Sequence, residues 1–216
     1  MLQTGALLLL SRADRLGGAI KERSMADTPS HHFIYGSCTD YLTGETVVDT
    51  DDERIRQQIA RFLVEEKGYA KEAIIPRRKI ETLFAGQFVV STIDLTVRAG
   101  GRELFIIRYG PGSLVTRERP AIAAARVLNP EYQLPFAVVT NGRDAEFLDT
   151  TTGKVLNTGM AAIPDRLQAE DLAAAAIFPT PPEDTRREKE LRILNAFDVE
   201  VCCAGGSCAL PNAPEG

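Results

Sequence analysis

Three β-rich segments that follow one another closely constrain the fold of this chain more than any other feature. Residues 73–81, 87–98 and 103–109 are rich in β-branched and apolar side chains, and glycine-containing turns at 85–86 and 99–101 lie between them. Connections this short join antiparallel neighbours, because a parallel pair needs a crossover of a dozen or more residues. The sequence therefore predicts an antiparallel three-stranded meander.

Helical patterns lie on both sides of the meander. Thr50 and Glu53 have the spacing of a capping box, apolar residues then recur at helical spacing, and Gly68 supplies a stop, which predicts a helix over residues 51–67. Residues 116–128 predict a second helix with an alanine-rich face, which ends before Pro130.

A continuous apolar run at residues 134–140 predicts a strand that is buried on both faces. The Asn-Gly turn at 141–142 then leads to a strand at 145–148, and a further short strand is expected after Gly153. The order of elements predicts an α/β fold in which a mixed central sheet is flanked by helices.

The length of 216 residues indicates one ordinary domain with extensions. We expect an N-terminal extension, partly disordered, at 1–49; the folded domain at 50–165; peripheral C-terminal helices at 166–198; and a cysteine-containing tail at 199–216. Within the third part, residues 167–177 and 183–197 have helical patterns, with prolines between them.

The composition indicates a cytoplasmic protein that does not span a membrane. Hydrophobic residues make up 44% of the chain, but no apolar run approaches the length of a membrane span. The four cysteines are unaccompanied by a recognisable secretory signal, and we interpret residues 1–24 as a dispensable extension with Met25 as the natural start.

Charge is distributed unevenly along the chain. The net charge of −5 argues against a nucleic-acid partner, but residues 71–126 contain ten Lys and Arg against five Asp and Glu. That window has a net charge of +5, which leaves −10 on the remainder. The distribution therefore keeps a nucleic-acid partner open, beside the alternative that these cations form an ordinary solvated surface.

Asp94 lies inside the second β-rich segment, where a carboxylate must be either solvated or paired. Strand alternation places Thr92, Asp94 and Thr96 on one face, so one interpretation is an outward polar face. The other interpretation is a functional carboxylate.

Several short phrases follow one another in this region. They are Arg56-Gln57-Gln58, Glu65-Glu66-Lys67-Gly68-Tyr69, Ile93-Asp94-Leu95-Thr96-Val97, the strand at 104–109 and Val139-Thr140-Asn141-Gly142. Together they resemble the N-terminal nuclease domain of type I restriction enzyme R subunits. The resemblance covers roughly residues 50–165, and the order and spacing of the phrases are more specific than any one of them.

The resemblance implies a PD-(D/E)XK fold, also called restriction endonuclease-like, with a Mg²⁺ site. In that family an aspartate on the second strand and a Glu-x-Lys on the third hold the metal and orient the attacking water. Asp94 matches the aspartate, as the catalytic residue and metal ligand. Glu53 matches the acid that the first helix often contributes, although its place in a capping box explains it equally well.

The third strand departs from the family pattern. The expected Ile-Glu-x-Lys falls on Ile107-Arg108-Tyr109-Gly110, so an arginine replaces the metal-binding carboxylate and a glycine replaces the lysine. A cation at position 108 would repel Mg²⁺, and we expect Arg108 to pair with Asp94 across adjacent strands. On this interpretation the site is degenerate and no cofactor is bound.

The alternative is an active Mg²⁺-dependent endonuclease that uses Asp94 with a relocated carboxylate. Glu118 on the second helix is the nearer candidate. Glu103 lies about 17 Å from Arg108 along an extended strand, too far to share a metal ion.

The basic window predicts a DNA-binding surface around the degenerate site, with the loop at 110–113 offering backbone donors at a helix start. Its alternative is that half of the cations pair with local acids. The expected nucleic-acid-binding residues are Arg77, Arg78, Lys79, Arg108, Arg117 and Arg119.

Two further interpretations concern partners. Cys202, Cys203 and Cys208 could ligate zinc with Cys38 or a partner's ligand, but their spacing is not the usual Cys-x-x-Cys, which favours a tail with exposed thiols. The fold could instead serve as a protein-interaction scaffold that docks through its charged C-terminal helix. No Gly-x-x-x-x-Gly-Lys phosphate loop of a helicase motor occurs in the sequence.

Overall fold

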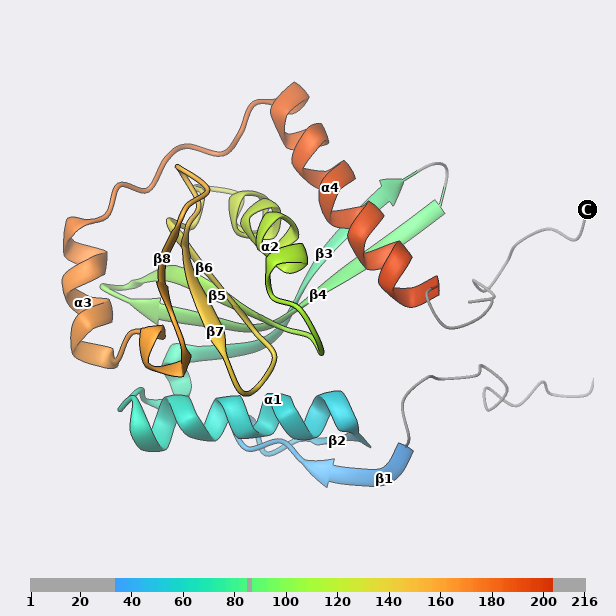
Figure 1. Ribbon diagram of the computed structural model, residues 1–216, viewed down its shortest axis with the longest axis vertical. Helices are drawn as coiled ribbons and strands as arrows, with labels where there is room; N and C mark the ends of the chain where they lie inside the picture. The colour runs from blue at the N-terminus through green and yellow to red at the C-terminus, as the bar shows by residue number, and fades with distance from the viewer. Residues whose placement is uncertain (1–33, 85–86, 204–216) are drawn as a thin grey trace, which may run out of the picture.

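A six-stranded mixed sheet with helices on both faces forms the centre of the molecule (Figure 1). The structure is a computed structural model that describes residues 34–84 and 87–203. The predicted class, a mixed α/β fold with a central sheet flanked by helices, is confirmed. In sheet order the strands are β3 (Ile74–Phe84), β4 (Gln87–Ala99), β5 (Arg102–Tyr109), β6 (Phe136–Thr140), β7 (Ala145–Asp149) and β8 (Val155–Thr158).

The predicted meander is confirmed, since β3, β4 and β5 pair antiparallel in sequence order. Gly100 and Gly101 both have positive φ in the second turn, a conformation that glycine adopts without steric cost. The first predicted turn, Ala85-Gly86, lies outside the described residues. Pairing of β4 with β5 ends at Leu95 and Ile107, whereas pairing of β3 with β4 continues to the tip, so the two strands extend past the sheet as a hairpin.

β6 is the buried strand that the apolar run predicted. It pairs parallel to β5, and helix α2 (Val115–Val127) provides the crossover between them. All five residues of β6 are buried, because α2 packs on one of its faces and the α1-side core lies on the other. The short strand expected after Gly153 is β8.

Helix α1 (Asp51–Arg61) begins where the sequence predicts. The Thr50 hydroxyl accepts a hydrogen bond from the backbone N–H of Glu53 at 3.1 Å, which caps the helix. The helix continues through a π-helical turn, η1 (Phe62–Glu66), and ends at Gly68, whose φ is 74°. The capping box is half formed, because the Glu53 carboxylate is engaged elsewhere.

The sheet separates two hydrophobic cores. On one face, α1 and α3 (Arg166–Ala175) cover side chains such as Leu95 and Ile107. On the other face, α2 and α4 (Asp184–Cys203) cover Ile93 and Ile106. Alternate residues of β5 therefore point to different helical layers.

Helix α4 is not peripheral, contrary to the sequence prediction. It packs along α2 and across the β3–β4 hairpin, and Glu190, Leu194 and Asn195 are buried in that interface. No described helix combines the length and apolar character needed to cross a membrane.

A β-hairpin that the sequence analysis did not identify precedes α1. It consists of β1 (Ile34–Thr39) and β2 (Thr46–Thr50), which pair antiparallel. In its turn, Asp40 Oδ1 accepts hydrogen bonds from the N–H groups of Leu42 and Thr43, at 2.9 and 2.8 Å. The predicted start at Met25, the side chains of Cys202 and Cys203, and Cys208 lie outside what the structure describes.

Candidate functional site

Three carboxylates and two arginines gather between α1, the β1–β2 turn and the bent part of β3 and β4. We call this group the α1 cluster, and its carboxylates are buried, with Asp40, Glu53 and Asp94 exposed by 2, 5 and 7%. Buried carboxylates need partners for all their oxygens. The members are Asp40, Glu53, Arg56, Gln57, Arg77 and Asp94.

Asp94 lies where β4 and β5 stop pairing. Its Oδ2 accepts a hydrogen bond from the backbone N–H of Tyr109 at 2.9 Å, so the side chain takes the place of a ladder partner. Its Oδ1 accepts from Arg56 Nε at 3.1 Å and from Arg56 Nη2 at 2.8 Å. The interpretation of an outward polar face is wrong, since Asp94 and Thr96 are both buried.

Glu53 shares Arg56 with Asp94. Arg56 Nη1 donates to Glu53 Oε2, while Glu53 Oε1 accepts from Gln57 Nε2 at 2.6 Å and from Arg77 Nη2 at 2.7 Å. Glu53, Arg56 and Gln57 stand at helical positions i, i+3 and i+4, which puts them on one face of α1. A single guanidinium therefore bridges the two acids that the sequence assigned to the site.

The backbone conformation of β3 at Arg77 places this side chain in the α1 cluster. Pro76 pairs with Leu95 and Arg78 with Ile93, so Arg77 lies opposite Asp94, and its φ of 54° falls in the left-handed region that non-glycine residues rarely adopt. Its Nη2 also donates to Asp40 Oδ2 at 2.5 Å.

Asp40 closes the cluster from the β1–β2 turn. Its Oδ2 accepts from Gln57 Nε2 at 2.9 Å. Burial acts to raise the pKa of Asp40, but hydrogen bonds from the Thr43 N–H, Arg77 and Gln57 together lower it to about 2. Neither Asp40 nor Gln57 was singled out from the sequence for a role, although the spacing of Gln57 from Glu53 along the helix could have indicated it.

The residues of the α1 cluster do not fit Mg²⁺. Arginine, glutamine or backbone donors already engage both oxygens of Asp94 and of Glu53. A magnesium ion prefers oxygen ligands in a near-octahedral set, and the third expected ligand position carries Arg108. Within the described residues, no group of three or more His, Cys, Asp or Glu side chains is placed to hold a metal ion.

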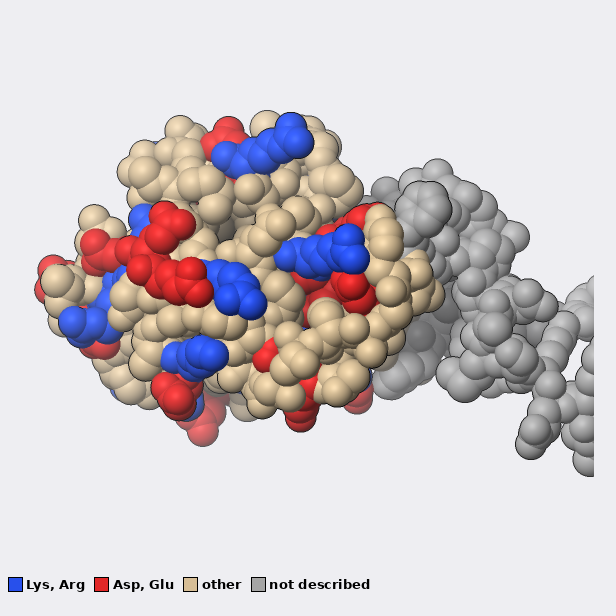
Figure 2. All heavy atoms as spheres, turned by 90° about the horizontal axis from the view of Figure 1, so that it is seen from below, with Lys and Arg blue, Asp and Glu red and all other residues tan. Residues whose placement is uncertain are grey.

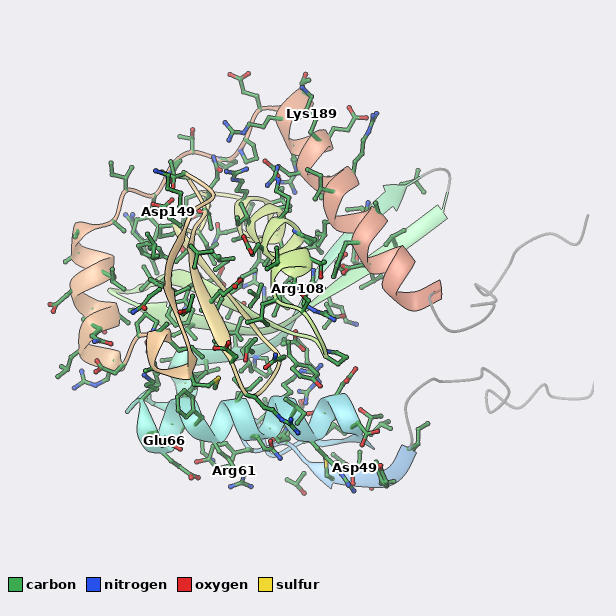
Figure 3. All side chains as sticks on the ribbon, in the orientation of Figure 1. Asp49, Arg61, Glu66, Arg108, Asp149 and Lys189 are labelled. Carbon is green, nitrogen blue, oxygen red and sulfur yellow. The ribbon has the colours of Figure 1, made fainter. Side chains whose placement is uncertain are left out.

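Arg108 does not pair with Asp94, and that prediction is wrong. Its Nη2 contacts Asp198 Oδ1 of α4 at 2.8 Å. The neighbouring Ile107 packs into the α1-side core, so Arg108 points to the opposite face of the sheet. Figure 3 labels Arg108, which lies on the α4 side, whereas Asp94 is engaged by α1.

A different cation fills the space of the missing lysine. A Cβ built on Gly110 would lie 1.6 Å from Arg117 Nη1, so the guanidinium of Arg117 occupies the volume in which a side chain at 110 would begin. Arg117 Nη2 donates to the carbonyl of Pro111 at 2.5 Å. Burial, with a smaller contribution from the nearby charge of Arg108, lowers the pKa of Arg117.

Ion pairs engage most of the cations that the sequence predicted to bind nucleic acid. Arg77 pairs with Asp40 and Glu53, and Arg78 pairs with Glu103, while Lys79 is exposed. On the α4 side, Arg108 pairs with Asp198, and Arg119 Nη2 lies 2.8 Å from Glu190 Oε2.

Neither relocated carboxylate joins Asp94. Glu118 interacts with Glu146 of β7, and burial together with the Glu118 carboxylate raises the pKa of Glu146. Glu103 is engaged by Arg78 and by Asn129 Nδ2, the latter at 3.1 Å. The structure thus brings together Glu53 and Asp94, and it leaves Glu103 and Glu118 with other partners.

Comparison with known proteins gives one match. No curated protein and no solved structure matches the chain. The family described as type I restriction enzyme R protein N terminus matches residues 51–164, which run from the start of α1 to just before α3. This range is more than half of the chain and contains Glu53, Arg56, Asp94 and Arg108, so the chain belongs to the family of type I restriction enzyme R protein N-terminal domains.

Proposed function

We propose that this chain is a PD-(D/E)XK-type domain that binds nucleic acid without cutting it. The observation that carries the proposal is the guanidinium of Arg56, which bridges Glu53 and Asp94 where the resemblance implies a metal ion. The order of helix, three-stranded meander, helix and parallel strand supports the fold assignment.

A fixed guanidinium can neutralise these carboxylates but cannot replace the chemistry of a metal ion. It presents N–H donors in a rigid plane and has no coordination position at which water could be held and activated. A metal would have to displace Arg56 and leave that cation buried beside it. The cluster therefore favours a structural role for Asp94 and Glu53.

Nucleic-acid binding is supported by the family and by the placement of cations away from the α1 cluster. Arg108, Arg117 and Arg119 lie at the end of β5 and in the first turns of α2, next to the loop at 110–113. Phosphate contacts of this kind provide affinity without reading sequence. On the face formed by α1 and the β1–β2 hairpin, basic and acidic side chains are interspersed, so that face offers no continuous basic track (Figure 2).

Cleavage is tested with plasmid DNA and Mg²⁺ or Mn²⁺, on the wild type and on Asp94→Asn. We expect no nicking by either protein above the level of a buffer control. Metal-dependent nicking by the wild type that Asp94→Asn abolishes would establish the alternative, an active endonuclease that uses Asp94.

Binding is tested by fluorescence anisotropy of a labelled DNA duplex over a salt series. We expect the affinity to fall steeply as salt rises, because phosphate contacts release counterions. The double variant Arg117→Gln/Arg119→Gln should bind several-fold more weakly and show a shallower salt dependence. Arg192→Gln is the control, since Arg192 is exposed on α4 and, among the described residues, pairs only with Glu188.

The test avoids Arg77 and Arg78 because both are less exposed than Arg119 and are held in ion pairs within the fold. Their removal would leave carboxylates unpaired and change stability. Arg119 also pairs with Glu190, but that carboxylate keeps Arg126 as a partner when Arg119 is replaced. Salt-independent binding, or equal binding by the double variant and the wild type, would contradict the proposed nucleic-acid surface.

A further inference from the structure

The basic surface at the end of β5 and the start of α2 is covered by a helix that lies outside the family match. The match ends at residue 164, and α4 begins at Asp184, after a connection that contains Pro179, Pro181 and Pro182. Figure 1 shows α4 along the same side of the sheet as α2. The fold shared with the family thus carries an added element on this face.

The sheet-facing side of α4 presents carboxylates to arginines. Asp198 contacts Arg108 at 2.8 Å, and Glu190 contacts Arg126 at 2.6 Å. Because Glu190, Leu194 and Asp198 are spaced by four residues, they form one stripe along the helix. The last described turns of α4 also bring Phe197 near Arg117, whose guanidinium carbon lies 5.7 Å from the ring centroid.

The two ends of this stripe differ in how completely their polar groups are hydrogen-bonded. Arg126 is buried and donates through Nε to the carbonyl of Thr150 at 2.8 Å and through Nη1 to Glu190 Oε1, and Leu194 is fully buried. These contacts anchor the middle of α4. At Asp198, Arg108 Nη2 and Asp198 Oδ1 form the pair, while Arg108 Nη1 and Asp198 Oδ2 make no hydrogen bond with any described residue.

Unsatisfied polar atoms concentrate at this end. Among the described residues, seven buried side-chain nitrogen and oxygen atoms make no hydrogen bond, and three of them lie in the contact between the last turns of α4 and the arginines. Buried polar groups in folded proteins nearly always have a partner, so such a concentration marks an incomplete contact. The three atoms are Arg108 Nη1, Arg117 Nε and Asp198 Oδ2, whereas Glu190 Oε2, further back along the helix, lies 2.8 Å from Arg119 Nη2 in an ion pair.

Arg108 and Arg117 share few carboxylate partners. Burial, and then the nearby charge of Arg108, lower the pKa of Arg117, and among the described ion pairs Asp198 is the one carboxylate that pairs with either guanidinium. A phosphate group has several acceptor oxygens and could accept hydrogen bonds from both guanidinium groups at once.

We propose that Arg108 and Arg117 form a phosphate-binding pair, and that the Phe197–Asp198 turn of α4 is an intramolecular cover which a nucleic-acid phosphate replaces. Glu190 and Leu194 keep the middle of the helix docked while its last turn moves aside. This proposal rests on the proposed nucleic-acid binding and adds the surface, the ligand group and the competitor to it.

The test compares two acid-to-amide variants of the full chain on the same helix. Asp198→Asn removes the competing charge, whereas Glu188→Gln removes a charge that is 62% exposed and, within the described part of the chain, pairs only with Arg192. Both variants change the net charge by the same amount. In the anisotropy assay we expect Asp198→Asn to bind the DNA duplex about tenfold more tightly and Glu188→Gln to remain within about twofold of the wild type, because the first variant raises the population of the uncovered state.

The double variant Asp198→Asn/Arg108→Gln should lose the gain, since one member of the phosphate-binding pair is removed. Hydrogen exchange of the wild type gives an independent readout. On addition of the duplex, amides near Phe197 should lose protection, while those around Glu190 should keep it.

The outcomes separate this proposal from the one on which it rests. Equal tightening by Asp198→Asn and Glu188→Gln, with unchanged protection near Phe197, would overturn the cover while leaving nucleic-acid binding intact. If no protein binds the duplex, Asp198→Asn included, both proposals are wrong.

Discussion

Two layers of arginine–carboxylate contacts lie on opposite faces of the same sheet, and they differ in how completely they are satisfied. In the α1 cluster, none of the buried side-chain polar atoms lacks a hydrogen bond, so far as the described residues go. Among the described residues, the α4 side contains three that do, beside Glu190 Oε2, which is in an ion pair with Arg119. Similar chemistry therefore gives a closed, structural network on one face and an incomplete, exchangeable contact on the other.

The difference follows from where the partners come from. The α1 cluster combines a helix, a bent strand and a tight turn that each fix a side chain, and its donors include backbone N–H groups. The α4 contact joins long arginine side chains to a helix that is reached through a proline-containing connection. Backbone donors are already fixed and cost little entropy to align, whereas an arginine held in a single pair loses side-chain freedom for one contact.

Loss of Arg56 should have the largest effect on stability. Arg56→Met leaves Glu53 and Asp94 buried without their shared cation, and breaking a buried ion pair in this way costs about 3 kcal/mol or more. Urea denaturation measures the free energy of unfolding. Arg54→Met is the control, because Arg54 pairs with Asp49 at the surface and its loss should cost less than about 1 kcal/mol. Equal costs for the two variants would mean that the α1 cluster is not a structural network.

Asp40→Asn should cost less and should do so only above acidic pH. Because hydrogen bonds lower the pKa of Asp40 from 3.8 to about 2, the ionised carboxylate contributes about 2 kcal/mol at neutral pH. The folded-state pKa is the lower one, so this contribution is complete above pH 3.8 and is lost as the pH falls to about 2. Unfolding of both proteins over a pH series measures it, and a difference that does not shrink in acid would contradict the assignment.

Asp198→Asn should change stability by less than about 1 kcal/mol, although it removes the ion pair with Arg108. One oxygen of Asp198 and one nitrogen of Arg108 already lack hydrogen bonds, so little is lost. The matching Asp94→Asn change on the other face should cost clearly more in the same urea experiment. If Asp198→Asn lowered the free energy of unfolding more than Asp94→Asn, the proposed distinction between the two faces would be wrong.

Glu146→Gln should produce the smallest effect and in the opposite direction. Burial and the neighbouring Glu118 raise the pKa of Glu146, so the folded state disfavours its charge. Stability is then lost as the pH rises through that pKa, and the glutamine variant avoids the loss. We expect a slightly higher Tm at neutral pH and no advantage in acid, measured by thermal unfolding at both. A lower Tm at neutral pH would show that the carboxylate has an unrecognised partner.

Much of the fold could be predicted from local sequence signals. The turn glycines, the capping threonine and the apolar run of β6 each act through neighbouring residues, and the elements they predicted are present. The β1–β2 hairpin was missed because its strands are short and mostly exposed, so no alternation of apolar and polar residues marks them.

The candidate site was predicted in part. Asp94 and Glu53 do meet, but the cation between them is Arg56 and not a strand neighbour. The prediction for Arg108 was wrong because it assumed that β4 and β5 remain paired at Asp94. Their pairing ends at Leu95, and beyond that point the register does not give the face to which a side chain points. The contact of Asp198 with Arg108 could not be predicted from neighbouring residues, since 90 residues separate the two in sequence.

The position of α4 also has a consequence for the order of folding. Leu194 completes the core on the α2 side, and Thr82 contacts Asn195 across a separation of 113 residues. Contacts between residues so distant in sequence require a long loop to close, which slows their formation relative to local ones. The β3–β4 hairpin and α2 should therefore assemble first and expose Ile93 transiently, and in pulse-labelling during refolding the amides of α4 should be among the last to gain protection.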